Sequence, residues 1–124
     1  MLVGSVAQVL VIDADDDFRR SVGCFLKDSG LEVLQAGDGR EGLKVALRQR
    51  PDLVITAIIM PIKDGLEVIG ELRRQKFPGR IIAVSGHVAR GALYREAAKL
   101  LGADETLTEP FSATELLDAV NRLI

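Results

Sequence analysis

The chain has little of several residue types on which protein function often depends. It contains one cysteine, one histidine and one tyrosine among its 124 residues, and it has no tryptophan. A single cysteine cannot form an internal disulfide, and a single histidine cannot supply a histidine-based metal cluster. The 16 Lys and Arg and the 18 Asp and Glu side chains give a net charge of −2. Without a basic excess to neutralise phosphates, direct binding of nucleic acid by this domain is not expected.

Long apolar runs are also missing. No stretch approaches the roughly 18 apolar residues that span a membrane, and the apolar start at 1–12 lacks the basic residues of a signal peptide. The length suits one domain, and 48% apolar side chains are enough to build a core. We therefore expect a single cytoplasmic domain over residues 1–124, free-standing or part of a longer protein, with no membrane association.

Short apolar segments alternate five times with longer segments of helical period. Continuous runs of Val, Ile and Leu are typical of parallel strands covered on both faces. Strands are predicted at 8–12, 31–36, 53–55, 81–84 and 105–108, and helices at 15–29, 38–50, 65–76, 88–101 and from 112 onward. This order predicts an α/β fold, a doubly wound five-stranded parallel sheet with right-handed crossovers.

Local signals mark several of the helix ends. Gly30 follows the first helix as a typical C-terminal stop. Asp38 with Glu41, and Ser112 with Glu115, have the spacing of a capping box at the start of the second and fifth helices.

The carboxyl ends of parallel strands are the usual place for a functional site. Few reactive side chains stand at those ends here. The residues after the first, third, fourth and fifth strands are Asp13 with Ala14, then Ala57, Ser85 with Gly86, and Glu109.

Five stretches of the sequence, in their order and spacing, resemble a response-regulator receiver domain of two-component signalling across essentially the whole chain. They are VLVIDADDDFRR (9–20), AGDGREGL (36–43), PDLVITAIIMPIKDGLEVI (51–69), IIAVSGH (81–87) and GADETLTEPFSATELL (102–117). The resemblance implies a flavodoxin-like (βα)5 fold with strand order 2-1-3-4-5.

The resemblance also implies a chemistry, which is phosphoryl transfer from a histidine kinase to an aspartate with the help of Mg²⁺. The departures from the family's pattern fall on its reactive positions, although Asp13 and the switch hydroxyl of Ser85 are kept. The two positions at which the family has metal-binding acids are occupied by Asp13 and Ala14, and the phosphoacceptor position is occupied by Ala57. The switch hydroxyl is that of Ser85. Glu109 stands at the position of the family's lysine, and Thr106 at that of its aromatic switch residue. Ala57 has no oxygen to phosphorylate, and Glu109 would repel an incoming anion.

We therefore interpret the chain as a degenerate pseudo-receiver that is not an enzyme and signals by protein contact. Expected partners are a histidine kinase, phosphotransfer or effector protein, a fused output domain or a second copy. No cofactor is expected beyond weak Mg²⁺ at Asp13. The family's interaction face, on the fourth helix, fifth strand and fifth helix, would carry Arg90, Leu93, Tyr94, Thr106 and Arg122, with Tyr94 as an aromatic anchor.

Two other functions are considered. A phosphorelay receiver could be phosphorylated at a non-standard acid such as Asp15, although the 15–17 acids are better explained as caps of the first helix. A flavodoxin-like cofactor domain is disfavoured because the acidic segment after the first strand is not a glycine-rich phosphate loop. Ser85 is interpreted as a cap of the following helix.

Several single residues carry simpler expectations. Cys24 lies among apolar residues of the first helix, so a buried, inert thiol is expected. His87 is expected to be an exposed loop residue without a special role. The basic residues of the helices are interleaved with acids and are predicted to form a solvated surface; they include Arg19, Arg20, Arg73, Arg74, Arg90 and Arg95.

Overall fold

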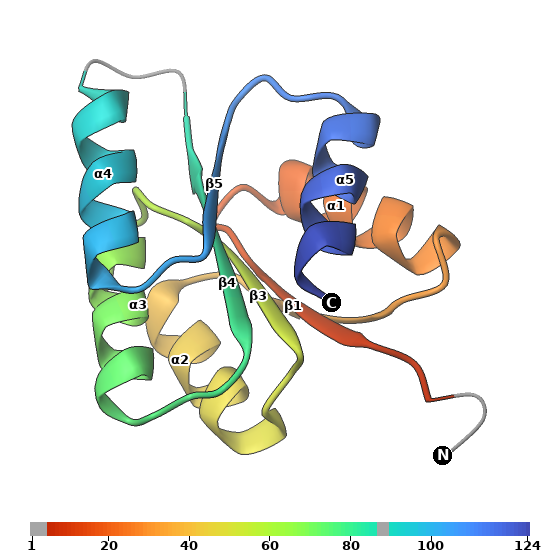
Figure 1. Ribbon diagram of the computed structural model, residues 1–124, viewed down its shortest axis with the longest axis horizontal. Coiled ribbons are helices and arrows are strands. Elements are labelled where there is room, and N and C mark those ends of the chain that lie inside the picture. The colour runs from red at the N-terminus through yellow and green to blue at the C-terminus, as the bar shows by residue number, and fades with distance from the viewer. Residues whose placement is uncertain (1–4, 87–89) are drawn as a thin grey trace.

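The computed structural model describes residues 5–86 and 90–124, and it confirms the predicted fold class. The elements are β1 (Gln8–Ile12), α1 (Asp16–Asp28), β2 (Glu32–Ala36), α2 (Gly39–Gln49), β3 (Leu53–Ala57), α3 (Gly65–Arg74), β4 (Arg80–Ser85), α4 (Gly91–Leu101), β5 (Glu105–Thr108) and α5 (Ala113–Leu123). All paired strands are parallel, and their order is β2-β1-β3-β4-β5 (Figure 1). His87 and the predicted start of the fourth helix lie outside the described residues.

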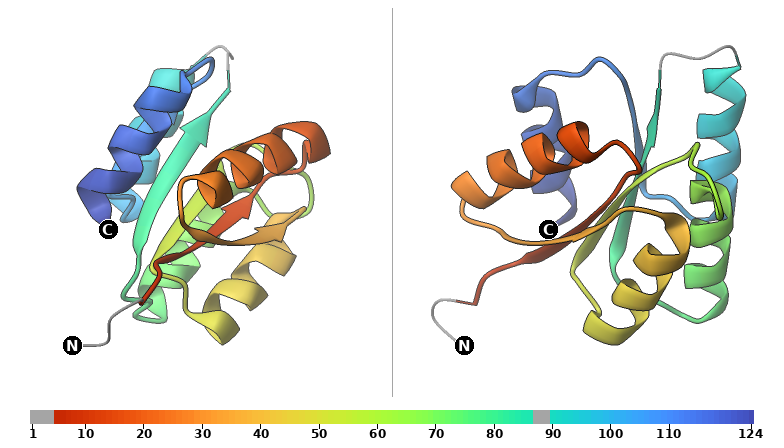
Figure 2. Two further views of the ribbon diagram at one scale, coloured as in Figure 1. Left: turned by 90° about the vertical axis from the view of Figure 1, so that its right-hand side faces the viewer. Right: turned by 180° about the vertical axis from the view of Figure 1, so that it is seen from behind.

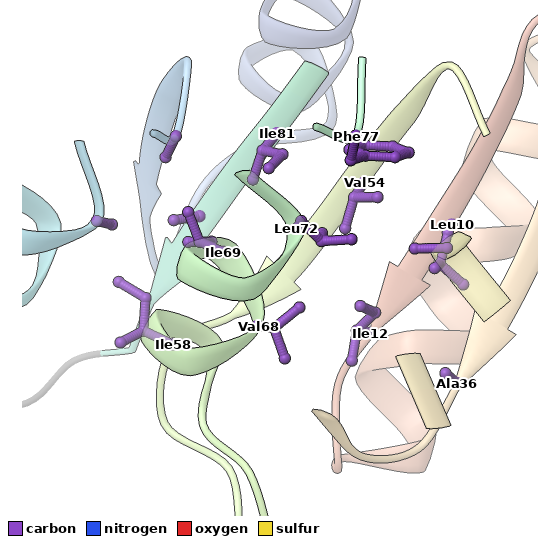
Figure 3. Packing of buried hydrophobic residues seen from close by; sticks show 14 of the residues in the cluster. Leu10, Ile12, Ala36, Val54, Ile58, Val68, Ile69, Leu72, Phe77 and Ile81 are labelled. Carbon is purple, nitrogen blue, oxygen red and sulfur yellow. The ribbon is translucent and has the colours of Figure 1, made fainter. Parts of the chain in front are cut away.

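Helices cover both faces of the sheet. Figures 1 and 2 show α2, α3 and α4 on one face and α1 and α5 on the other. Side chains alternate along each strand, so neighbouring residues enter different cores. In β1, Leu10 and Ile12 belong to the core on the side of α2, α3 and α4, where Figure 3 labels them, whereas Val9 and Val11 belong to the core on the side of α1 and α5. The two apolar layers share only the sheet between them.

Two strands extend further than predicted, and the extension reaches the candidate site. β3 runs to Ala57, which pairs with Val84 of β4, and β4 runs to Ser85, which pairs with Thr108 of β5. Thr56 and Ala57 end the run of Val, Ile and Leu from which β3 was predicted, but backbone pairing does not depend on the type of side chain. Ala57 and Ser85 therefore occupy the last positions of β3 and β4.

Side-chain caps fix the starts of four helices. Asp15 caps α1 by accepting a hydrogen bond from the Phe18 backbone N–H at 3.1 Å, as expected. The capping box of Ser112 with Glu115 is confirmed. At α2 the structure shows one half of the predicted box, in which the side chain of Asp38 accepts a hydrogen bond from the backbone N–H of Glu41 at 2.8 Å.

The complete box of α3 was not predicted. There, the side chain of Asp64 accepts a hydrogen bond from the backbone N–H of Glu67, and the side chain of Glu67 accepts one from the backbone N–H of Asp64.

Arg73 links three segments at the far end of α3. Its Nε donates to the carbonyl of Gly102 at 3.0 Å, and its Nη1 donates to the carbonyls of Phe77 and Gly79, both at 2.9 Å. Its Nη2 forms an ion pair with Asp104 at 3.0 Å. The side chain thus ties the end of α3 to the α3–β4 loop and the α4–β5 loop.

Two sequence interpretations are corrected here. Arg73 is only 27% exposed and bonds backbone carbonyls, so it is not part of a solvated surface, whereas the adjacent Arg74 is 70% exposed. Cys24 is exposed rather than buried. It lies on the solvent side of α1, between the buried positions Val22, Gly23 and Leu26.

Ile62 has an unfavourable backbone conformation in the β3–α3 loop. Its φ is 72°, a region in which a β-branched residue is strained, and its side chain is 69% exposed. Replacing Ile62 with Gly is expected to raise the free energy of unfolding by about 1 kcal/mol, because glycine adopts this φ without strain. Chemical denaturation measures the change. Ile59→Gly is the control, since Ile59 is similarly exposed at an ordinary φ and should lose stability; equal losses in both variants would contradict the strain.

Candidate functional site

The carboxyl edge of the sheet carries a hollow of about 240 Å³. It brings together three positions singled out from the sequence, Asp13, Ala57 and Glu109. The lining residues are Asp13, Asp15, Phe18, Ala57, Ile59, Val84, Gly86 and Glu109. Among these, Phe18 and Val84 were not anticipated, because nothing in their local sequence indicates a site.

Asp13 is the most deeply buried acid of the hollow, with 9% of its surface exposed. Its Oδ1 accepts a hydrogen bond from the backbone N–H of Asp15 at 2.9 Å. Burial raises the pKa of Asp13, and the charge of Asp15 adds to the rise, while this hydrogen bond and Arg19 act in the opposite direction. The carboxylate therefore has a higher free energy here than in water.

The alanines leave the hollow short of oxygen donors. Ala57 lines it with a methyl group, and Ala14, next to Asp13, is exposed. Over residues 5–86 and 90–124, no three acidic, histidine or cysteine side chains are placed to hold one metal ion. Mg²⁺ requires near-octahedral oxygen coordination, so the residues present do not fit a magnesium site of the kind that the family resemblance implies.

Glu109 places a second acid where the resemblance implies a lysine. Its backbone N–H donates to the carbonyl of Ser85 at 2.9 Å, which holds the residue beside the end of β4. Burial raises the pKa of Glu109, and the charges of Asp13 and Asp15 raise it further. Three carboxylates thus repel one another around the hollow.

This repulsion predicts a pH-dependent gain from Glu109→Gln. An acid whose pKa is raised by folding makes the folded state lose stability as pH rises above the ordinary value of 4.5. The variant should therefore be more stable at pH 7, by about 0.5 kcal/mol after allowance for solvent screening, and the gain should vanish below pH 4.5. Denaturation between pH 4 and 8 measures this. Glu96→Gln, on the exposed face of α4, is the control, and a gain that persists in acid would contradict the explanation.

Ser85 does not cap the following helix, which corrects the sequence interpretation. Its buried hydroxyl accepts a hydrogen bond from Nη1 of Arg95 at 3.0 Å. The residue before α4 is instead Arg90, and it makes no side-chain cap bond. Arg95 therefore anchors α4 to the end of β4, a contact across ten residues that no sequence pattern indicates.

The residues of the expected interaction face differ in their exposure to solvent and in the contacts that they already make. Leu93 is 61% exposed on α4, and Arg90 is exposed at its start. Tyr94 is half-buried and packs against the core beneath α4. Thr106 is half-buried on β5, and Arg122 forms an ion pair with Glu105 at 2.9 Å.

A larger hollow, of about 550 Å³, lies at the opposite edge of the sheet. It lies where the strands begin, away from the strand ends at which the site residues gather. Its lining residues are Ser5, Val6, Ala7, Arg50, Pro51, Asp52, Pro78, Gly79, Arg80, Leu123 and Ile124.

Comparisons with known proteins identify the family of the chain. The profile of the family described as "Response regulator receiver domain" matches residues 9–121. Among curated proteins, the chain is 37% identical over 118 residues to the transcriptional regulatory protein PrrA of Mycobacterium tuberculosis, covering 94% of this chain and 49% of PrrA. It is 33% identical over 118 residues to the alkaline phosphatase synthesis transcriptional regulatory protein PhoP of Bacillus subtilis, covering 94% of this chain and 48% of PhoP. The chain thus spans about half the length of these relatives.

Solved structures give the same comparison in three dimensions. The chemotaxis protein CheY4 of Vibrio cholerae is 30% identical with a TM-score of 0.87, covering 97% of this chain and all of CheY4. A receiver domain protein of Clostridium thermocellum is also 30% identical, with a TM-score of 0.89, covering 96% of this chain and 94% of that protein. Within the part of the chain that the structure describes, no helix is long and apolar enough to cross a membrane.

Proposed function

The chain belongs to the response-regulator receiver family of two-component signalling, and we propose that it is a receiver that works by protein contact, without aspartyl phosphorylation. One observation carries this proposal. The hollow at the carboxyl edge has the methyl group of Ala57 at the acceptor position and carboxylates at Asp13, Asp15 and Glu109. At position 57 a phosphoryl group would find no oxygen to attach to, and at position 109 it would meet a carboxylate where the family has a lysine.

The proposed output is a binding event, not catalysis. Leu93 on α4 and Arg90 directly before this helix are exposed, which suits contact with a kinase, phosphotransfer or effector protein, or with a second copy. The similar proteins of twice this length are named transcriptional regulators, so a fused or separate output domain is part of the proposal. Mg²⁺ binding at Asp13 is proposed to be weak at most, and the site of action is proposed to be cytoplasmic.

Phosphorylation from a small donor tests the proposal. Incubation with Mg²⁺ and acetyl phosphate is expected to leave the intact mass of the protein unchanged, because position 57 offers no carboxylate. A receiver that retains the aspartate, treated in parallel, shows that the donor is active. A stoichiometric adduct of one phosphoryl group that hydroxylamine removes would overturn the proposal.

A second candidate is phosphorylation at Asp15, which lines the same hollow and is exposed. Its carboxylate caps α1 through Phe18, and transfer to it would replace this charged acceptor with a weaker, neutral carbonyl. We rank it second for that reason. An adduct that is lost in Asp15→Asn would identify this acceptor.

A further inference from the structure

We propose that a second copy of this chain is a binding partner, and that each copy inserts Leu100 into a hollow between α3 and α4 of the other. The inference rests on the proposed function and deepens it, because it names one partner and the surface that this partner covers. That surface lies on the side of α4 next to α3, whereas the expected interaction face lies toward β5 and α5 (Figure 1).

The α3–α4 hollow has an apolar part with room for an incoming side chain. Its volume is about 280 Å³, and its apolar lining residues are Leu66, Gly70 and Leu101. A Cβ at Gly70 would lie 3.6 Å from Nη1 of Arg74 and 3.7 Å from Cδ2 of Leu101, which are ordinary contact distances. The fold therefore does not require a glycine at this position, and the missing side chain leaves space in the hollow.

An apolar side chain that suits this space stands exposed at the end of α4. Leu100 is 84% exposed, the highest value among the large apolar side chains of the described residues. Leu93 lies two turns earlier on the same side of the helix and is 61% exposed. Contact of these side chains with water is unfavourable, so covering them favours association.

The charges around the hollow suit the residue next to Leu100. The rim consists of two acids and two bases, which are Lys63, Glu67, Glu71 and Arg74. Their ion pairs are long, at 3.7 to 3.9 Å, so the acids can still accept from an incoming cation. Lys99 directly precedes Leu100 and is exposed. A lysine followed by a leucine thus matches the hollow in charge and in apolar character. The chain itself carries this pair, which favours a second copy over an unrelated protein.

The position of Leu100 beside the hollow allows both copies to bind at once. Leu101, the next residue of α4, lines the hollow. A twofold axis beside the end of α4 therefore lets each Leu100 enter the hollow of the other copy, with the same surface used twice. Such an interface closes on itself, so we expect a dimer and no larger assembly.

Sedimentation velocity of the purified chain over a range of concentrations tests the inference. The weight-average mass is expected to rise toward that of a dimer between about 10 µM and about 1 mM, the range of a small interface. Over the same range, the amides of Gly70, Leu100 and Leu101 are expected to shift in spectra of the ¹⁵N-labelled protein.

Two variants change the inserted side chain and the space that receives it. Leu100→Gln should weaken dimerisation by roughly tenfold or more, because the change acts twice in a symmetric dimer. Gly70→Ala should weaken dimerisation roughly threefold while it keeps or raises the stability of the monomer, since alanine favours a helix over glycine. Val6→Gln is the control. It removes an exposed apolar side chain at the opposite edge of the sheet and should leave dimerisation unchanged.

Charge reversal tests the contact of Lys99 with the acidic part of the rim. Lys99→Glu should weaken dimerisation roughly fivefold at low salt, and the addition of Glu71→Lys should restore part of the loss. Glu71 suits this test better than Glu67, whose side chain also accepts a hydrogen bond from the backbone N–H of Asp64 at the start of α3.

Three results would overturn the inference. They are a monomer at every concentration, dimerisation that neither Leu100→Gln nor Gly70→Ala weakens, and assemblies that grow beyond a dimer. A phosphoryl adduct contradicts the proposed function instead, and it leaves the mass measurements of the untreated chain as they are. The two failures are therefore distinguishable.

Discussion

Replacing Arg73 with alanine is expected to lower the free energy of unfolding by about 2–4 kcal/mol. The variant loses four hydrogen bonds, three of them to backbone carbonyls, and leaves Asp104 without its closest cation. Asp104 also accepts from the backbone N–H of Ile81 at 2.8 Å, so the loss extends to the start of β4. Urea denaturation followed by circular dichroism measures the change.

The neighbouring residue supplies the control for this variant. Arg74 is exposed and forms an ion pair with Glu71 at a long 3.7 Å, so Arg74→Ala should change stability by less than about 0.5 kcal/mol. Arg73→Lys should remain destabilised, because a single ammonium group cannot reach carbonyls on both sides of it. Equal effects of Arg73→Ala and Arg74→Ala would show that the four bonds contribute nothing.

Rebuilding the acceptor site is expected to convert an inert domain into a phosphorylated one. Ala57→Asp alone should accept little phosphoryl from acetyl phosphate, because Glu109 repels the donor and Ala14 supplies no oxygen for Mg²⁺. Adding Ala14→Asp and Glu109→Lys should raise the phosphorylated fraction at least tenfold, which corresponds to about 1.4 kcal/mol of transition-state stabilisation. Intact-mass spectrometry measures the fraction.

The double variant Ala14→Asp/Ala57→Asp distinguishes the effect of restored Mg²⁺ binding from the effect of the positive charge that Glu109→Lys adds. If Glu109 is the barrier, the double variant stays well below the triple variant at saturating Mg²⁺. Equal phosphorylation of the single and triple variants would contradict the role assigned to Glu109.

The sequence was sufficient for the fold because the signals involved are local. Apolar runs and capping residues identified every element and most ends, and the family resemblance supplied the strand order that the sheet has. Two of the errors, at Arg73 and Ser85, come from contacts between segments. Arg73 reaches Gly102 and Arg95 reaches Ser85, and neither pairing leaves a pattern in the residues between.

The candidate site shows the same division. Asp13, Ala57 and Glu109 could be placed together from strand ends alone, since the carboxyl ends of parallel strands meet at one edge. The role of Ser85 could not be predicted from the sequence. A hydroxyl at a strand end can cap the following helix, and it can equally accept a hydrogen bond from a distant side chain. Only the side-chain direction of Arg95 decides between them.

The separation of the two cores has a consequence for how this chain can vary in evolution. Leu10 and Ile12 belong to one core, and Val9 and Val11 belong to the other. A substitution in one core does not change the packing of the other core, so the apolar residues of the two cores can diverge at separate rates. The length of β1 is not free, because deleting one residue would exchange the two sets and misplace both at once. The strand therefore tolerates new side chains on either face far better than any change in its number of residues.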